Sequence, residues 1–139
     1  MLYAPVTLAT ASVTVLAAGF YFYTAFRVGD LRAKHNIKAP ACAGHPEFDR
    51  AYRVQMNTLE TLAIVLPLLW IGTLYPIGPM LAWLAPLVGL VWVLSRVVYL
   101  RGYMADPENR LAGAMIGGIC SALLLLIAIV GLVRAWMIV

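Results

Sequence analysis

The chain has 139 residues, of which 63% are hydrophobic and only 12% are charged. An ordinary soluble domain has roughly half apolar and a quarter charged residues, so this composition excludes a water-soluble globular protein. Membrane orientation and anionic lipid headgroups explain the formal net charge of +4 more simply than nucleic-acid binding does.

Three long stretches, residues 1–26, 61–95 and 111–133, contain no charged side chain. A helix needs about 20 apolar residues to cross the hydrocarbon core of a membrane. Glycines and prolines between Gly72 and Pro79 break the middle stretch into two such helices. The sequence therefore predicts an all-α integral membrane protein. We expect a single four-helix bundle over residues 1–139, with spans at about 4–26, 52–73, 80–101 and 108–136.

Basic residues gather in and around the first predicted loop, whereas the second loop has none. They are Arg27, Arg32, Lys34, Lys38, Arg50 and Arg53. The positive-inside rule therefore places the first and third loops in the cytoplasm. The first span lacks the basic start of a signal peptide, so we expect it to be retained. The short loops favour a bacterial inner membrane.

The two cysteines, Cys42 and Cys120, are expected at different membrane depths and are poor disulfide partners. Cys42-Ala-Gly-His45 has a spacing that some metal sites use. A metal site normally needs more ligands than this pair supplies. We therefore expect no metal.

A polar stripe leads from the first loop into the second span. At about 100° per residue, Arg50, Arg53, Asn57 and Glu60 share one narrow face of a helix. A charge facing lipid is costly, so this face is expected to point at protein or ligand. The stripe is explained equally well by contacts that hold helices together and by a ligand site.

The third span carries a second stripe near its cytoplasmic end, where Arg96, Tyr99 and Tyr103 share one face. Each residue alone has an ordinary explanation as a snorkelling arginine or an interfacial tyrosine. Together they match the first stripe in depth and membrane side, which favours a shared polar pocket.

The fourth span begins at Asp106-Pro107-Glu108, where aspartate is typical of a helix N-cap and proline of the first helical position. Arg110 follows in the first turn, where the helix dipole disfavours a cation. Arg110 is therefore either a positive-inside anchor or a partner for an anion. Arginines, hydroxyls, an amide and a carboxylate suit a small anionic ligand that carries an amine, and glutathione has that composition.

These motifs resemble the MAPEG family, the membrane-associated proteins of eicosanoid and glutathione metabolism. The resemblance rests on the segment from Glu47 to Glu60, on Arg96-Val-Val-Tyr99-Leu-Arg-Gly-Tyr103, and on Arg110. It extends over nearly the whole chain and implies a homotrimer with glutathione bound between neighbouring subunits. By this resemblance the glutathione-binding residues are Arg32, Arg53, Gln55, Asn57, Glu60, Arg96, Tyr99 and Tyr103. Arg110, assisted by Tyr103, would stabilise the glutathione thiolate.

The resemblance implies a glutathione transferase, with a possible peroxidase activity, acting on lipophilic electrophiles or lipid hydroperoxides. Leukotriene C synthase has two tandem basic residues where this chain has Arg32-Ala33-Lys34, and an aromatic residue where it has Thr61. These departures favour a broader detoxifying enzyme. Two alternatives are a non-catalytic lipid-binding scaffold and a small channel or transporter subunit. The wholly apolar outer halves of the second and third spans disfavour a channel.

Overall fold

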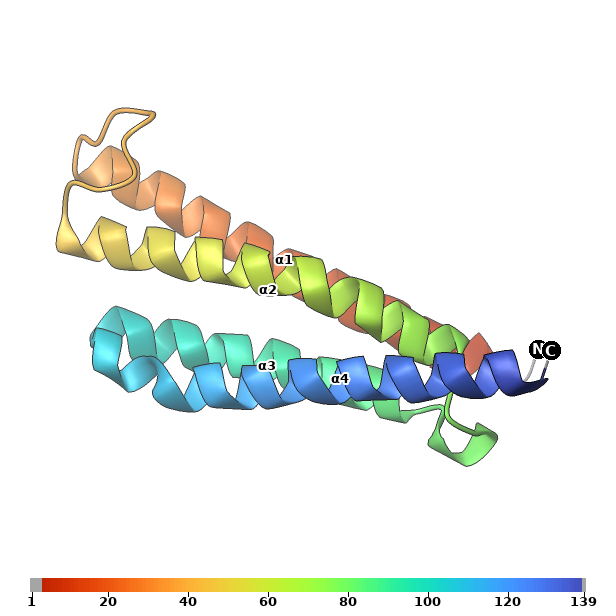
Figure 1. The fold of residues 1–139 in the computed structure, drawn as a ribbon. Helices are drawn as coiled ribbons and strands as arrows, with labels where there is room; N and C mark the ends of the chain where they lie inside the picture. Colours follow the sequence, from red (N-terminus) through yellow and green to blue (C-terminus); the bar gives the residue numbers. More distant parts are fainter. Residues whose placement is uncertain (1–3, 139) are drawn as a thin grey trace.

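The computed structural model describes residues 4–138 and confirms the predicted bundle of four long helices. The helices are α1 (Ala4–Lys34), α2 (Pro46–Leu74), α3 (Leu84–Ala105) and α4 (Leu111–Ile138). Short 3-10 helices, η1 (Pro79–Leu81) and η2 (Pro107–Arg110), precede α3 and α4. The start of α1 and the end of α4 lie at one end of the bundle, and the α1–α2 loop and the α3–α4 junction lie at the other (Figure 1). The outermost residues of the predicted domain, 1–3 and 139, lie outside the described residues.

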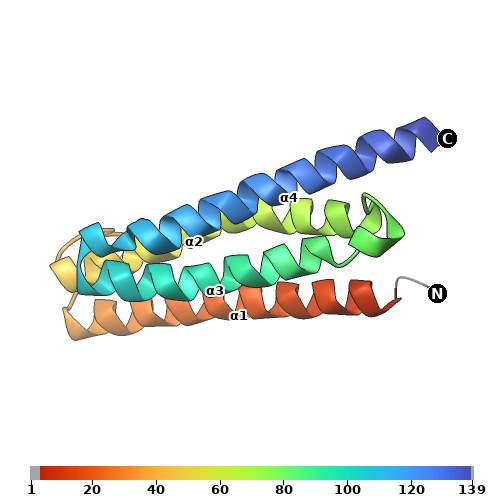
Figure 2. The same cartoon turned by 90° about the horizontal axis from the view of Figure 1, so that it is seen from below.

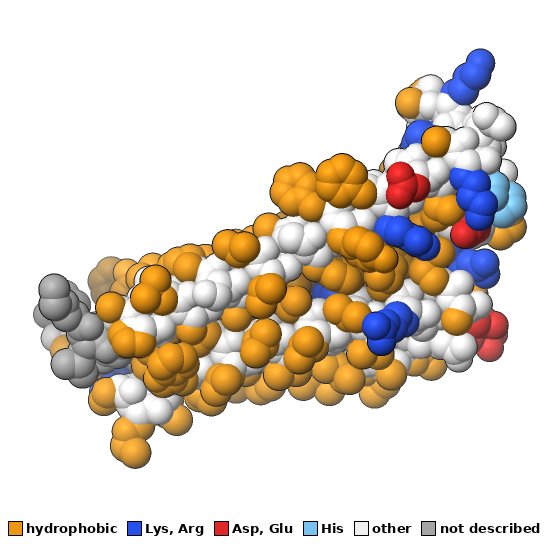
Figure 3. Space-filling model, turned by 180° about the vertical axis from the view of Figure 1, so that it is seen from behind, with side chains coloured by type: hydrophobic (Ala, Val, Ile, Leu, Met, Phe, Trp, Pro, Cys, Tyr) orange, Lys and Arg blue, Asp and Glu red, His pale blue; other side chains and the backbone are white. Residues whose placement is uncertain are grey.

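All four helices are long and apolar enough to cross a membrane. Hydrophobic side chains cover the length of the bundle, and charged side chains gather at the end that carries the α1–α2 loop (Figure 3). Helices satisfy their backbone hydrogen bonds internally, which lipid requires. The chain is therefore an integral membrane protein.

The helices extend beyond the predicted spans. The first helix continues to Lys34 and the second begins at Pro46, so the first loop is shorter than predicted. His45 caps α2, because its Nδ1 accepts a hydrogen bond from the backbone N–H of Glu47 at 3.2 Å. The predicted cap Asp106 also accepts from the N–H of Glu108, at 2.9 Å. The first turn after Asp106 is the 3-10 helix η2, however, and α4 begins only at Leu111.

An apolar core holds the four helices together. Each helix contributes to it, as Val13, Leu69, Trp92 and Leu124 illustrate. Figure 2 shows α3 beside α1 and α4 crossing over α2, so that every helix contacts the core. This packing fixes the relative depth of α2, α3 and α4, on which the polar residues described below depend.

Candidate functional site

The polar stripe of α2 lies in the half of the bundle nearer the α1–α2 loop. Arg53 and Glu60 are exposed at the bundle surface, and Arg50 and Asn57 are half-buried. Buried Val54 and Thr58 on the same helix pack inward and fix its rotation. The stripe therefore faces outward along one edge of the bundle, toward α4 and the end of α3.

A direct hydrogen bond joins the two predicted stripes. Asn57 Nδ2 on α2 donates to Tyr99 Oη on α3 at 2.6 Å. The Tyr99 side chain is only 4% exposed, and its ring centroid lies 5.6 Å from that of Tyr103 one helical turn away. Both tyrosines pack around the fully buried Val54. The two stripes therefore meet in the same part of the bundle.

Arg96 is the most unusual residue of this region, because it carries a charge within an apolar helix and yet is only 4% exposed. It stacks over the rings of Tyr99 at 4.7 Å and Trp92 at 5.5 Å, a cation–π arrangement. One nitrogen, Nη2, donates to the carbonyl oxygen of Gly113 at 3.2 Å. Its Nε has no hydrogen-bond partner among the described residues. The hydrogen-bonding capacity of the guanidinium is therefore not fully used by the described residues.

Two glycines of α4 make room for this arrangement. A Cβ at Gly113 would collide with the backbone of Tyr99, and a Cβ at Gly117 would collide with the Arg96 guanidinium. Sequence reasoning missed their role, although Gly113-Ala-Met-Ile-Gly117 is the small-residue spacing that lets membrane helices approach closely. The close approach of α3 and α4 buries Arg96 and Tyr99.

Side chains from three helices line a cavity of about 240 Å³, which we call the α2–α4 cavity. Its lining residues are Asn57, Glu60 and Thr61 of α2, Arg96 and Tyr99 of α3, and Ala114, Gly117, Gly118 and Ser121 of α4. Four of them, Asn57, Glu60, Arg96 and Tyr99, were predicted from the sequence, whereas Thr61 and Ser121 were not. A carboxylate, a guanidinium, an amide and a phenol in one cavity suit a ligand that carries both an amine and carboxylates.

A second hollow lies nearer the end of the bundle and contains two more predicted residues, Arg53 and Tyr103. This hollow has a volume of about 360 Å³ and is lined by Cys42, Ala43, Asp49, Arg50, Tyr52, Arg53, Tyr103 and Pro107. Arg110, which is exposed, contacts it through Tyr103: the Arg110 Nη1 atom lies 3.5 Å from Tyr103 Oη. The Arg110 guanidinium also lies 5.5 Å from the centroid of that ring. The two residues predicted to act on a thiol are therefore neighbours.

Within one chain, the structure does not bring Arg32 and Gln55 to the α2–α4 cavity. Arg32 Nη1 donates to the carbonyl oxygens of Ala41 at 2.9 Å and Ile37 at 3.4 Å, and its guanidinium lies 4.8 Å from the centroid of the Phe48 ring. Arg32 therefore supports the α1–α2 loop in this chain. Gln55 is half-buried and lines neither hollow, because two residues along a helix correspond to about 200° of rotation from Arg53.

The family model and the named relatives agree on one family. The sequence model of the MAPEG family matches residues 10–130. Microsomal glutathione S-transferase 2 of Homo sapiens is 32% identical over 127 residues, covering 91% of this chain and 84% of the human protein. Leukotriene C4 synthase of Bos taurus is 33% identical over 123 residues, covering 88% and 79%. A protein of Synechocystis sp. without an assigned activity is 38% identical over 122 residues, covering 88% and 86%.

Proposed function

This chain belongs to the MAPEG family, and from that premise we propose that it is a membrane-embedded glutathione transferase. It would conjugate glutathione to lipophilic electrophiles or use glutathione to reduce lipid hydroperoxides. The observation that carries the proposal is the α2–α4 cavity, where Glu60, Asn57, Tyr99 and Arg96 converge from two helices. The names of the relatives support a glutathione-dependent transferase in general.

The lining of the cavity matches the groups of glutathione. Glu60 would pair with the ammonium group, while Arg96 in the cavity wall and Arg53 in the second hollow would bind carboxylates. Asn57 and Tyr99 would bond to the peptide groups, which requires opening or sharing their 2.6 Å hydrogen bond. The tripeptide would then lie along the bundle surface with its sulfur toward Tyr103 and Arg110.

Activation of the sulfur would come from Arg110 and Tyr103. A free thiol with a pKa of about 8.5 is only a few per cent ionised at neutral pH. A guanidinium beside the sulfur stabilises the thiolate and lowers that pKa, by about 1.4 kcal/mol for each unit. In conjugation, the thiolate sulfur forms a bond to the electrophilic carbon as the leaving group departs. In peroxide reduction, two glutathione molecules become one disulfide while the hydroperoxide becomes an alcohol and water.

Neighbouring subunits would complete the site. Arg32 and Gln55 do not line the α2–α4 cavity of their own chain, so they would contribute to glutathione binding across a subunit boundary. A homotrimer with shared sites accounts for this division. The basic first loop supports a cytoplasmic position for this end of the bundle, where glutathione arrives from water and the second substrate arrives from the lipid.

Purified protein should be assayed with glutathione against a chlorodinitrobenzene-type electrophile and against a lipid hydroperoxide. We expect turnover of at least one of the two. Arg101→Ala is a matched control, because this arginine is exposed on α3 and lines neither hollow; it should leave turnover unchanged. Glutathione binding without turnover of either substrate would contradict the enzyme and support the lipid-binding scaffold.

A further inference from the structure

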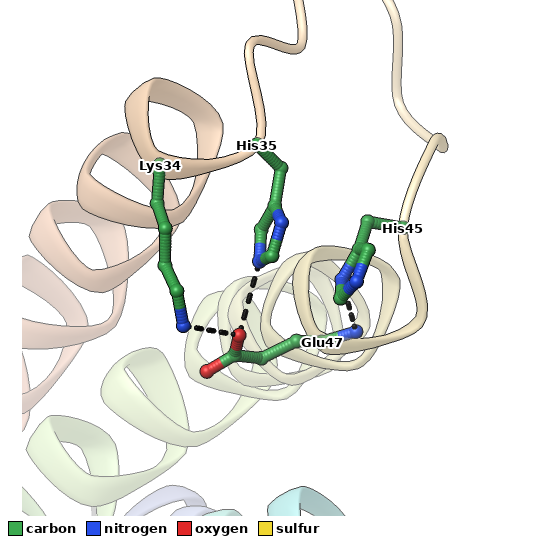
Figure 4. Close-up of polar contacts among 4 residues, drawn as sticks. All are labelled: Lys34, His35, His45 and Glu47. Carbon is green, nitrogen blue, oxygen red and sulfur yellow. Dashed lines mark hydrogen bonds and ion pairs between the residues drawn. The ribbon is translucent and has the colours of Figure 1, made fainter.

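The α1–α2 loop brings together three metal-ligating side chains outside the glutathione site. His35 follows the end of α1, His45 caps α2, and Glu47 lies in the first turn of α2. One nitrogen of each imidazole and one oxygen of the carboxylate all lie within 4.8 Å of one another. Figure 4 shows the two imidazole rings side by side above Glu47. From the sequence alone we expect no metal, and Cys42 of the Cys42-Ala-Gly-His45 spacing is not part of this cluster: its Sγ lies 3.3 Å from Pro40 O and 3.2 Å from Tyr52 Oη.

The three side chains already contact one another closely. His35 Nε2 lies 3.0 Å from Glu47 Oε2, and the His35 and His45 rings are stacked with centroids 3.5 Å apart. Lys34 Nζ lies 2.8 Å from the same carboxylate oxygen. This arrangement holds the end of α1 against the start of α2 (Figure 4).

We propose that His35, His45 and Glu47 form a binding site for a divalent transition-metal ion of the Zn²⁺ type. Two imidazoles and one carboxylate are the ligand set that Zn²⁺ and similar borderline ions prefer, whereas Ca²⁺ and Mg²⁺ prefer oxygen ligands alone. Water completes a four-coordinate site.

Binding needs only small movements. Tetrahedral ligands bound about 2.0–2.2 Å from an ion lie roughly 3.4 Å apart, close to the 3.0 Å that already separates His35 Nε2 from Glu47 Oε2. His45 is exposed, and to bind the ion its ring would have to turn out of the stack with His35. If Nε2 is the ligand, Nδ1 remains the atom that can cap α2. The ion also displaces Lys34, whose side chain is 60% exposed and whose surface ion pair contributes little.

The bound ion would crosslink the end of α1 to the start of α2. The loop that it closes carries Cys42 and Ala43 to the wall of the second hollow and supplies the carbonyl oxygens that hold Arg32. Metal binding would therefore stabilise this loop and raise the unfolding temperature. The inference does not depend on glutathione chemistry and stands or falls separately from the proposed function.

The test is a calorimetric titration of Zn²⁺ into the full-length chain, purified without a histidine tag, treated with a chelator, and free of glutathione, which itself binds metals. We expect one ion per chain, and at least tenfold weaker binding in His35→Gln and in Glu47→Gln. Cys42→Ser should bind as the unmodified chain does. Lys34→Gln should bind more tightly, because it removes the cation that competes for Glu47.

Thermal unfolding in the same detergent is the second measurement. Zn²⁺ should raise the unfolding temperature of the unmodified chain and of Cys42→Ser but not that of His35→Gln, whose helix content is checked by circular dichroism. Absence of binding to the unmodified chain would overturn the proposal. Undiminished binding in the double variant His35→Gln/His45→Gln, or loss of binding in Cys42→Ser, would overturn it as well.

Discussion

The two halves of the bundle use the same helices for different purposes. In the half farther from the α1–α2 loop, Leu69 is 1% exposed in the apolar core, and a hydrogen bond of 2.8 Å between Thr10 and Thr73 joins α1 to α2. In the half nearer the α1–α2 loop, Arg96 is buried and Glu60 lines a cavity. The difference supports the proposal that one half supplies stability and the other binds the polar ligand.

Leu69→Ala should give the largest effect and only on stability. Removing a buried leucine leaves a cavity and costs about 2–5 kcal/mol, so the unfolding temperature in detergent should fall clearly. The KM for glutathione of the folded fraction should stay unchanged. If the KM for glutathione also rose clearly, the proposed division into a stabilising half and a ligand-binding half would be wrong.

Arg53→Ala should instead change the KM for glutathione and leave stability nearly unchanged. Arg53 is exposed, so its truncation should leave the unfolding temperature nearly unchanged. The loss of a charge-assisted hydrogen bond to a glutathione carboxylate, worth about 1.5–3 kcal/mol, should raise the KM roughly ten- to hundredfold. Steady-state kinetics with varied glutathione measures this effect. An unchanged KM would remove Arg53 from the proposed binding set.

Arg110→Ala should mainly reduce turnover. If Arg110 lowers the thiol pKa by one or two units, its loss costs about 1.4–2.8 kcal/mol of thiolate stabilisation. The affinity for glutathione should change less, because the thiol is a small part of the ligand. The ultraviolet absorbance of the thiolate and kcat measure the two consequences. A raised KM with unchanged kcat would contradict the role assigned to Arg110.

Gly113→Ala should affect both stability and glutathione binding, because this glycine packs directly against Tyr99 of the polar site. A Cβ there meets the backbone of Tyr99, whereas a Cβ at Gly118 meets nothing within 4 Å. Overpacking of this kind costs about 1–3 kcal/mol and would push α4 away from Arg96. Both the unfolding temperature and glutathione binding should suffer in Gly113→Ala, whereas Gly118→Ala should leave the unfolding temperature unchanged. Equal behaviour of the two variants would contradict the close approach of α3 and α4.

The helices and the two stripes could be predicted from the sequence because both follow local rules. Charge-free stretches of membrane length indicate helices, and the period of the α-helix places Asn57 beside Glu60 and Arg96 beside Tyr99. The lengths of the helices beyond the hydrocarbon core could not be predicted in the same way. Their ends depend on caps such as His45, which become recognisable only once the loop is folded.

Contacts between distant segments were largely beyond sequence reasoning. Gly113 and Gly117 admit the side chains of another helix, and their spacing alone does not reveal which. His35 and Glu47 are brought together by the path of the loop and not by any motif. The placement of Arg32 against the carbonyl oxygen of Ala41 likewise depends on that loop. The helical period describes the faces of a single helix, whereas each of these contacts joins two segments that are distant in the sequence.

Glutathione titrated into purified protein, with Glu60→Gln compared against the unmodified chain, tests the central claim most directly. Gln keeps the shape of the side chain but removes the charge that would pair with the ammonium group. Asp30→Asn is the control, because this exposed carboxylate of α1 lines neither hollow. The account predicts binding by the unmodified chain and Asp30→Asn, and at least roughly tenfold weaker binding by Glu60→Gln. Equal binding by all three would contradict it.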